Sequence, residues 1–212
     1  MEQKAVIVLA DGHVFEGKSF GAAGTVTGEA VFTTGMTGYL ETLTDPSYYG
    51  QIVMQTFPLI GNYGVIPGDF ESSGIHVRGY VVRDWCRAPS NFRSSGDIDS
   101  LLKKHNIIGL WGVDTRALTR IIRESGVMNA RIIALSGDAE RDKGALAELA
   151  MLEDPAQKGE LLSQIASYTI EDAVESVTLS SRPAEERAEG GRGKRVALFD
   201  YGAKGNIRRE LL

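Results

Sequence analysis

Residues 28–64 read GEAVFTTGMTGYLETLTDPSYYGQIVMQTFPLIGNYG and decide the character of the first half of the chain. An apolar run at 30–32 is followed directly by hydroxyl-bearing and glycine residues, and a second apolar run begins at residue 51. Between them Asp45, Pro46 and Ser47 predict a tight turn, because Asp accepts backbone hydrogen bonds and Pro fixes φ. A hydroxyl-rich loop between two strands is a common carrier of binding groups, so this loop is the first candidate for a functional site.

Working outward, apolar runs and turn residues predict a domain that is rich in strands at first and in helices later. Asp11-Gly12 between two apolar runs predicts a β-hairpin. Further strands are predicted at residues 29–32, 51–57, 79–82, 107–111 and 130–135. Helical spacing predicts helices at 97–105, 114–124, 138–153 and 160–166, with Pro155 interrupting the last two.

The end of the chain has a different composition. Residues 171–194 are rich in Ser, Glu, Arg and Gly, which predicts a linker. Residues 195–200, RVALFD, then predict a strand of the kind buried in a parallel sheet, and 207–212 the start of a helix. One strand and a short helix cannot form a core of their own, so we expect the sequence to be part of a longer protein.

Six motifs in this order resemble one known family, the small subunit of glutamine-hydrolysing carbamoyl phosphate synthetase. They are FTTGMTGYLETLTDPSYYGQIV, PLIGNYG, RGYVVR, SNFR, GVDTRALTR and FDYGAKGN. The resemblance implies an α/β protein in which residues 1–150 form a layered β/β/α amino-terminal domain. Residues 151–193 would be a helical connector and linker, and 194–212 the first strand and helix start of a truncated, doubly wound class I glutamine amidotransferase domain.

The resemblance also implies a function. Small subunits of this family hydrolyse glutamine and pass ammonia to a large subunit, which uses ATP and bicarbonate to make carbamoyl phosphate for pyrimidine and arginine biosynthesis. The intact enzyme is a ligase; its ATP and Mg act on the large subunit, so no cofactor is expected in this chain. The family's catalytic Cys, His and Glu belong to the amidotransferase domain, so we expect no catalytic residue here. The partners implied are the large subunit and L-glutamine.

Three residues are candidates for a site. In the family, the serine that matches Ser47 hydrogen-bonds the bound glutamine; the alternative is a turn hydroxyl that bonds its own backbone. Asp45 and Lys204 belong to two motifs that pack together in the family. We hypothesise that they meet at the domain interface and help line the route of ammonia; the alternative is a pair of solvated charges.

Other residues with reactive side chains carry weaker signals. Cys86 has no flanking glycine, unlike a nucleophile on a sharp turn, and is interpreted as structural. The three histidines, His13, His76 and His105, lack the spacing of metal ligands, so no metal is expected. The glycine-rich stretches at 21–24 and 190–195 lack the pattern of a phosphate-binding loop.

Arginines recur at helical spacing at Arg116, Arg120 and Arg123. A solvated helix face explains them more simply than docking to the large subunit, although both stay open. The chain departs from the family pattern at Leu40, where glutamine is usual, at Gly205, where a basic residue is usual, and at Trp111, in an otherwise small and aliphatic run.

Composition narrows the classes of function. A net charge of −5 argues against binding to nucleic acid. The single cysteine excludes an intrachain disulfide and suits the cytoplasm, and the apolar run at 5–10 is too short to span a membrane. The alternative to an enzyme subunit is a stand-alone partner-binding module without hydrolytic activity. The run at 195–200 favours the subunit, because such a module has no use for half of a new α/β unit.

Overall fold

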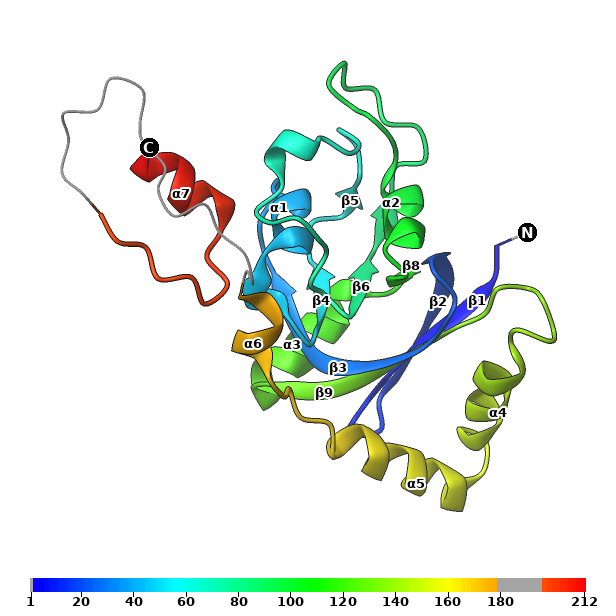
Figure 1. Ribbon diagram of the computed structural model, residues 1–212. Helices are drawn as coiled ribbons and strands as arrows, with labels where there is room; N and C mark the ends of the chain where they lie inside the picture. Colours follow the sequence, from blue (N-terminus) through cyan, green and yellow to red (C-terminus); the bar gives the residue numbers. More distant parts are fainter. Residues whose placement is uncertain (1, 179–195) are drawn as a thin grey trace.

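The computed structural model describes residues 2–178 and 196–212. Residues 4–134 form a closed barrel whose strands are hydrogen-bonded in the order β1-β2-β8-β6-β4-β3-β9 (Figure 1). The strands are β1 (Lys4–Leu9), β2 (Val14–Gly21), β3 (Gly24–Thr33), β4 (Gln51–Gln55), β6 (Gly79–Val82), β8 (Ile108–Trp111) and β9 (Met128–Ala134). Two short strands, β5 (Leu59–Ile60) and β7 (Asp84–Trp85), pair separately. The predicted strands in this region are confirmed.

The barrel mixes parallel and antiparallel pairs, and this mixture dictates where the helices lie. The predicted hairpin joins β1 and β2, with Val8 opposite Val14. By contrast, β4 runs parallel to both β3 and β6, and β6 runs parallel to β8. Parallel neighbours need a crossover connection. Helix α1 (Tyr39–Thr44) lies in the connection from β3 to β4, and α2 (Ile98–Lys104) lies in the connection that leads to β8.

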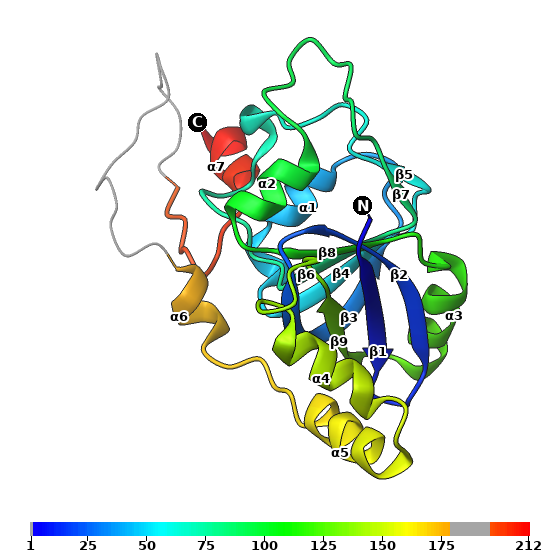
Figure 2. The same ribbon diagram turned by 90° about the vertical axis from the view of Figure 1, so that its right-hand side faces the viewer.

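Alternation of side chains along the strands builds separate apolar clusters on the two faces of the sheet. Inward-facing residues, including Ile7, Met54 and Ile132, pack with helix α3 (Thr115–Ser125). On the outer face Val53 and Tyr80 pack under α1 and α2. A third cluster joins β1 and β9 to α4 (Lys143–Met151) and α5 (Pro155–Ala166), which lie across that side of the barrel (Figure 2).

Aspartates begin three of the helices, as their side chains accept backbone amide hydrogen bonds. Asp97 accepts from Ser100 N at the start of α2, and Asp114 accepts from Ala117 N at the start of α3. Both helices were predicted within a residue or two of these bounds. Gly126, with φ of 80°, ends α3 as predicted.

Three details of the predicted later helices are wrong. The helix predicted from residue 138 begins only at Lys143, because the Asp142 carboxylate accepts hydrogen bonds from Ser136 and Gly137 in a turn that precedes it. Pro155 does not interrupt a helix but occupies the first position of α5, where a missing N–H costs nothing. Asp154 caps that helix, which therefore begins before the predicted residue 160.

The end of the chain differs from the prediction in three respects. Helix α6 (Ala173–Val177) lies inside the predicted linker, most of which falls outside the described residues. Residues 196–200 form no strand, because a strand needs a neighbour for its backbone groups and none is paired with this run in the described part of the chain. Helix α7 (Gly205–Leu211) is present and begins two residues before the predicted start, close to α1 (Figure 1).

The α/β class implied by the family resemblance is confirmed. The main sheet closes on itself, so the finer β/β/α layering is not confirmed. None of the helices formed by residues 2–178 and 196–212 combines the length and apolar character needed to span a lipid bilayer.

Close contact between β2 and β8 gives a first testable prediction. Gly109 lies opposite Phe20, and a Cβ atom at Gly109 would stand 2.5 Å from the Phe20 ring and 2.7 Å from its carbonyl oxygen. We expect Gly109→Ala to lower the free energy of unfolding by about 1–3 kcal/mol, because the ring and backbone must shift. Urea unfolding followed by circular dichroism measures this change.

Gly144→Ala is the matched control, since a Cβ atom in that part of α4 meets nothing within 4 Å. Alanine also favours a helix by up to about 1 kcal/mol over glycine, so the control should be neutral or stabilising. Equal effects of the two substitutions would contradict the packing argument.

Candidate functional site

The predicted turn at Asp45-Pro46-Ser47 is confirmed. Helix α1 ends at Thr44, and the Asp45 carboxylate accepts a hydrogen bond of 2.9 Å from the Ser47 amide, which starts the short 3-10 turn η1 (Pro46–Tyr48). Sequence reasoning missed α1. Its apolar residues Tyr39, Leu40 and Leu43, which are all buried, are the helical spacing that could have revealed it.

Ser47 is exposed at the tip of this turn. Its backbone N–H is engaged by Asp45, but no hydrogen bond joins its hydroxyl to another residue within 2–178 or 196–212. The alternative in which the hydroxyl bonds its own backbone is therefore not what the structure shows. A hydroxyl on a rigid turn, open to solvent, can donate to and accept from a ligand.

Thr44, the residue before the turn, is held in place by hydrogen bonds. Its hydroxyl donates to the Leu40 carbonyl oxygen at 2.7 Å and accepts from the Glu71 amide at 2.9 Å. The Ser72 hydroxyl donates to the Thr44 carbonyl oxygen at 2.7 Å. The segment at 71–72 therefore holds the last residue of α1, and with it the start of the turn, through two hydrogen bonds between buried or half-buried groups.

His76 continues this network. Its Nε2 atom lies 2.8 Å from the Ser72 hydroxyl. Burial lowers the pKa of His76 from its usual 6.5, and the charge of Asp45 opposes that shift. The imidazole is therefore mainly uncharged at neutral pH. His76 is one of the histidines interpreted as structural, and its contacts are those of a residue that supports the turn.

Asp45 and Lys204 are in direct contact, 2.6 Å apart between Oδ2 and Nζ. The Asp45 side chain is only 9% exposed, whereas that of Lys204 is 44% exposed. The hydrogen bond to Asp45 raises the pKa of Lys204. The alternative of two solvated charges is contradicted, while a role of the pair in the route of ammonia stays a prediction.

The segment that carries Lys204 is itself folded into a turn. The Asp200 carboxylate accepts hydrogen bonds from Gly202 N at 3.0 Å and Ala203 N at 2.9 Å. The backbone at Gly202, with φ of 93°, lies so close to Pro46 that an added Cβ atom would stand 3.1 Å from the proline Cβ. Two motifs whose contacting residues, Pro46 and Gly202, lie more than 150 positions apart in the chain are thus brought together beside Ser47.

A shallow groove borders Tyr49 and Gly50, the residues that follow this turn. Its volume is about 470 Å³, and polar side chains from the starts of neighbouring strands line it, namely Tyr49, His76, Arg78 and Asn106. Arg78 donates to the Thr27 carbonyl oxygen at 3.1 Å and lies over the Tyr168 ring. Nothing in the local sequence pattern indicated this groove, because its walls come from four distant segments.

The remaining candidate residues lie apart from this site. Cys86 is half-buried, and its amide donates to the Ile60 carbonyl oxygen. His13 pairs with Asp11 in the first hairpin, and His105 ends α2. In the part of the chain that the structure describes, no three His, Cys, Asp or Glu side chains are grouped so that they could hold a metal ion.

The structure shows what surrounds the arginines of α3 and two of the residues that depart from the family pattern. Arg116, Arg120 and Arg123 are exposed, and none forms an ion pair with an acidic side chain among the described residues. Leu40 is fully buried, which suits an apolar residue at that position. Trp111 lies under the Arg87 guanidinium, 4.7 Å from the ring centre, and Arg87 also lies over Trp85.

Comparison with known proteins identifies the family. Residues 7–132 match the family model described as carbamoyl-phosphate synthase small chain, CPSase domain. The chain is 44% identical over 209 residues to the carbamoyl phosphate synthase small chain of Clostridium perfringens, and 46% identical over 209 residues to that of Archaeoglobus fulgidus. It is 43% identical to the carbamoyl phosphate synthase pyrimidine-specific small chain of Halalkalibacterium halodurans. These alignments cover 99% of this chain and 52–53% of each relative.

The chain belongs to the carbamoyl-phosphate synthase small chain family, and it spans about half the length of the curated relatives that it matches. Among solved structures, an aminopeptidase from Aneurinibacillus sp. strain AM-1 overlaps 63% of this chain and 30% of its own, with a TM-score of 0.34 and 15% identity. A similarity this low carries no argument.

The buried setting of His76 predicts a dependence of stability on pH. Because burial disfavours the charged imidazole, the folded protein binds fewer protons at His76 than the unfolded chain does. We therefore expect the free energy of unfolding to fall as pH drops below the usual pKa of 6.5, and to be regained above it. Urea unfolding between neutral and mildly acidic pH measures this trend.

His76→Gln keeps a polar partner for Ser72 but cannot gain a proton. The variant should lose less stability than the parent over the same pH interval, and His13→Gln, at an exposed hairpin, serves as control. A slope unchanged by His76→Gln would show that other groups cause the pH dependence.

Proposed function

We propose that this chain acts as part of a carbamoyl phosphate synthase small chain, supporting glutamine hydrolysis and the delivery of ammonia to the large chain. The large chain then uses ATP and bicarbonate to form carbamoyl phosphate. The observation that carries the proposal is the contact between the two family motifs, where the Asp45–Lys204 pair of 2.6 Å holds the second motif beside the exposed hydroxyl of Ser47. No catalytic residue of glutamine hydrolysis is assigned to these 212 residues.

Ser47 is proposed to contact glutamine. The rigidity of its turn supports this role. Asp45 and Thr44 fix the turn, so little conformational entropy is lost when a ligand binds. The C-terminal segment also lies next to this turn, as Gly202 approaches Pro46, the residue before Ser47. Asp45 and Lys204 would then border the space through which ammonia leaves.

Residues 194–212 are proposed to begin the amidotransferase domain. Phe199 is 76% exposed, although it belongs to an apolar run of the kind that parallel sheets bury, and Tyr201, directly after that run, is 69% exposed. Such side chains need further apolar surface to cover them. A stand-alone binding module, the other candidate, offers no reason for leaving them open.

The arginine face of α3 is proposed as a docking surface for the large chain. Arg116, Arg120 and Arg123 gather positive charge on one exposed helix face of a chain whose net charge is −5. Exposed charges without partners steer association with an acidic surface. The cytoplasmic location expected from the single cysteine belongs to the same proposal.

The decisive experiment uses a chimeric protein, which we call the completed protein. Residues 1–212 are joined to the C-terminal half of the Clostridium perfringens relative, and the product is mixed with the large chain of that organism. We expect carbamoyl phosphate synthesis from glutamine as well as from free ammonia. Ser47→Ala should raise the KM for glutamine up to about tenfold, because that is the usual effect of losing one hydrogen bond. Ammonia-dependent synthesis should be unchanged.

The 212-residue chain alone, mixed with the same large chain, should bind it and allow synthesis from ammonia but not from glutamine. Synthesis from ammonia only, in the completed protein, would contradict the proposed role of this half in glutamine use. The stand-alone module would be favoured if neither protein bound the large chain.

Charge reversal on α3 tests the docking surface. We expect Arg116→Glu together with Arg120→Glu to weaken association with the large chain at least tenfold, since like charges then face each other. Arg141→Glu, at another exposed arginine, is the control. Equal effects of the two changes in light scattering would exclude α3 as the contact face.

A further inference from the structure

Helix α7 begins without a capping side chain of its own. Lys204, at its N-cap position, makes no such hydrogen bond. Instead Gly205 N donates to the Glu71 carbonyl oxygen at 2.6 Å, and Asn206 N donates to the Glu71 carboxylate at 2.9 Å. The first amides of a helix have no partner within the helix, so one residue from a distant segment satisfies two of them.

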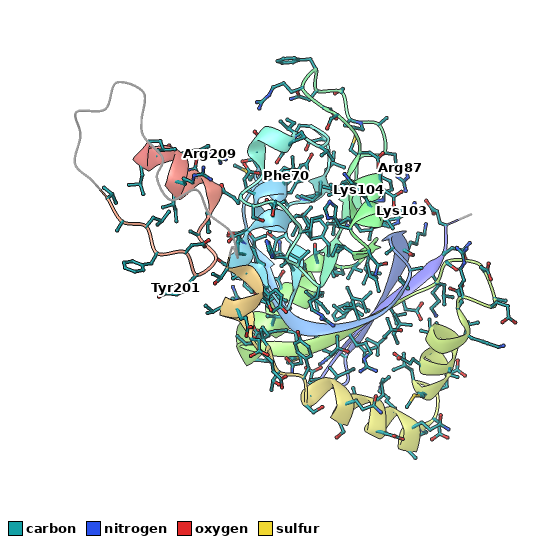
Figure 3. All side chains as sticks on the ribbon, viewed as in Figure 1. Phe70, Arg87, Lys103, Lys104, Tyr201 and Arg209 are labelled. Atoms are coloured by element: carbon teal, nitrogen blue, oxygen red, sulfur yellow. The ribbon has the colours of Figure 1, made fainter. Side chains whose placement is uncertain are left out.

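Arg209 adds a contact one turn further along α7. Its Nη2 atom lies 3.7 Å from Glu71 Oε1, and its Nη1 atom donates to the Phe70 carbonyl oxygen at 3.4 Å. Figure 3 shows Arg209 on α7, on the side that faces the segment carrying Phe70. The Glu71 carboxylate thus bonds the start of the helix with one oxygen and faces the guanidinium with the other.

Gly205 permits this close approach. A Cβ atom there would stand 3.1 Å from the Glu71 carbonyl oxygen and 3.4 Å from Arg209. These distances are tighter than ordinary van der Waals contact, so a side chain would push the helix away from Glu71. The small residue at this departure from the family pattern therefore lets the first turn of α7 sit directly on the segment at 70–71.

Glu71 is also tied to the turn that carries Ser47. The residue is 9% exposed, and its amide donates to the Thr44 hydroxyl at 2.9 Å. Thr44 directly precedes Asp45, whose carboxylate bonds both the Ser47 amide and Lys204. One residue therefore joins the start of α7, through a single intermediate side chain, to the turn that presents the Ser47 hydroxyl.

The Asp45–Lys204 pair cannot fix this geometry alone. Lys204 reaches Asp45 through a long side chain that is 44% exposed, so the pair limits distance but not the direction of the helix. Glu71 bonds backbone amides of two consecutive residues and thereby sets the direction in which α7 leaves the turn. The two contacts together define both position and orientation.

We propose that Glu71 is a positioning residue for glutamine binding, because it fixes α7 and the segment before it against the Ser47 turn. This inference rests on the proposed function, in which glutamine binds between Ser47 and the domain that continues from α7. Glu71 does not touch the substrate. Its loss leaves Ser47 in place but lets the opposite wall of the site move, which weakens binding of glutamine and not the chemistry of the large chain.

Amide hydrogen exchange on the ¹⁵N-labelled 212-residue chain tests the structural part. In Glu71→Ala we expect the amides of Asn206 and the rest of α7 to exchange about five- to tenfold faster, the usual consequence of losing one cap, whereas Gly205 keeps its bond to the main-chain carbonyl oxygen of residue 71. Glu71→Gln should be intermediate, because its amide oxygen still accepts from Asn206 but carries no charge for Arg209. Unchanged exchange in Glu71→Ala would overturn the proposal.

Asp69→Ala is the matched control. Asp69 is an acidic residue two positions away, and it pairs with Arg93 at 3.2 Å instead of with α7. Its removal should leave the exchange of α7 unchanged. Should Glu71→Ala fail to fold, as judged by its urea unfolding curve, Glu71→Gln and Arg209→Gln decide instead, and both should speed the exchange of α7.

Kinetics of the completed protein with the large chain test the functional part. We expect Glu71→Ala to raise the KM for glutamine about tenfold, with kcat and ammonia-dependent synthesis nearly unchanged, and Asp69→Ala to match the parent. A merely structural role would lower the amount of active protein and leave KM as it was. Looser α7 amides with an unchanged KM would overturn the positioning role while the proposed function stands.

Failure of the proposed function has a separate result. If the unsubstituted completed protein makes carbamoyl phosphate from ammonia but never from glutamine, the proposed function fails, and with it the role of Glu71 in binding glutamine. The exchange experiment, which needs no substrate, then still decides whether Glu71 fixes α7 to the turn.

Discussion

Closure of the barrel by β9 is the constraint on which the rest of the structure depends. This one strand pairs with β1 on one side, where Ala134 lies opposite Ala5, and with β3 on the other, where Ala134 lies opposite Gly24. The main sheet therefore has no free edge, and its inner face is filled by apolar side chains and α3. Because the barrel is closed and packed, recognition is left to the connections between strands.

The parallel pairing of β3 with β4 then determines where the candidate site lies. Two parallel neighbours cannot be joined by a tight hairpin, so the chain must travel back along the barrel before β4 begins. Helix α1 makes that crossing, and the Asp45-Pro46-Ser47 turn follows directly after it. The turn is rigid since α1 is buried on the outer face of the sheet and Thr44 is bonded to the segment at 71–72.

Two kinds of contact hold the C-terminal segment on this frame, and they differ in what they contribute. The ion pair between Asp45 and Lys204 is half exposed, so its contribution to stability is limited by solvent screening. The hydrogen bonds of Glu71 to the first amides of α7 are directional and lie around a buried carboxylate. A charge attracts the segment, whereas the bonds to the backbone orient it. Both contacts lie close to the turn that carries Ser47, so they couple this turn to α7.

Local sequence determined much of this protein by itself. Alternating apolar residues predicted the strands. Asp11-Gly12 predicted the first hairpin, and Asp97 and Asp114 predicted the starts of two helices, because the turn and the two helix caps depend on hydrogen bonds between residues close in the chain. Tertiary structure alone decided barrel closure and the absence of a strand at 196–200, since a strand requires a neighbour that local pattern cannot supply. The bond from Asn206 to Glu71 spans 135 residues, and no local pattern encodes it. Family resemblance placed Asp45 near Lys204, but the role of Glu71 emerged only where the folded chain brings an uncapped helix onto a buried carboxylate.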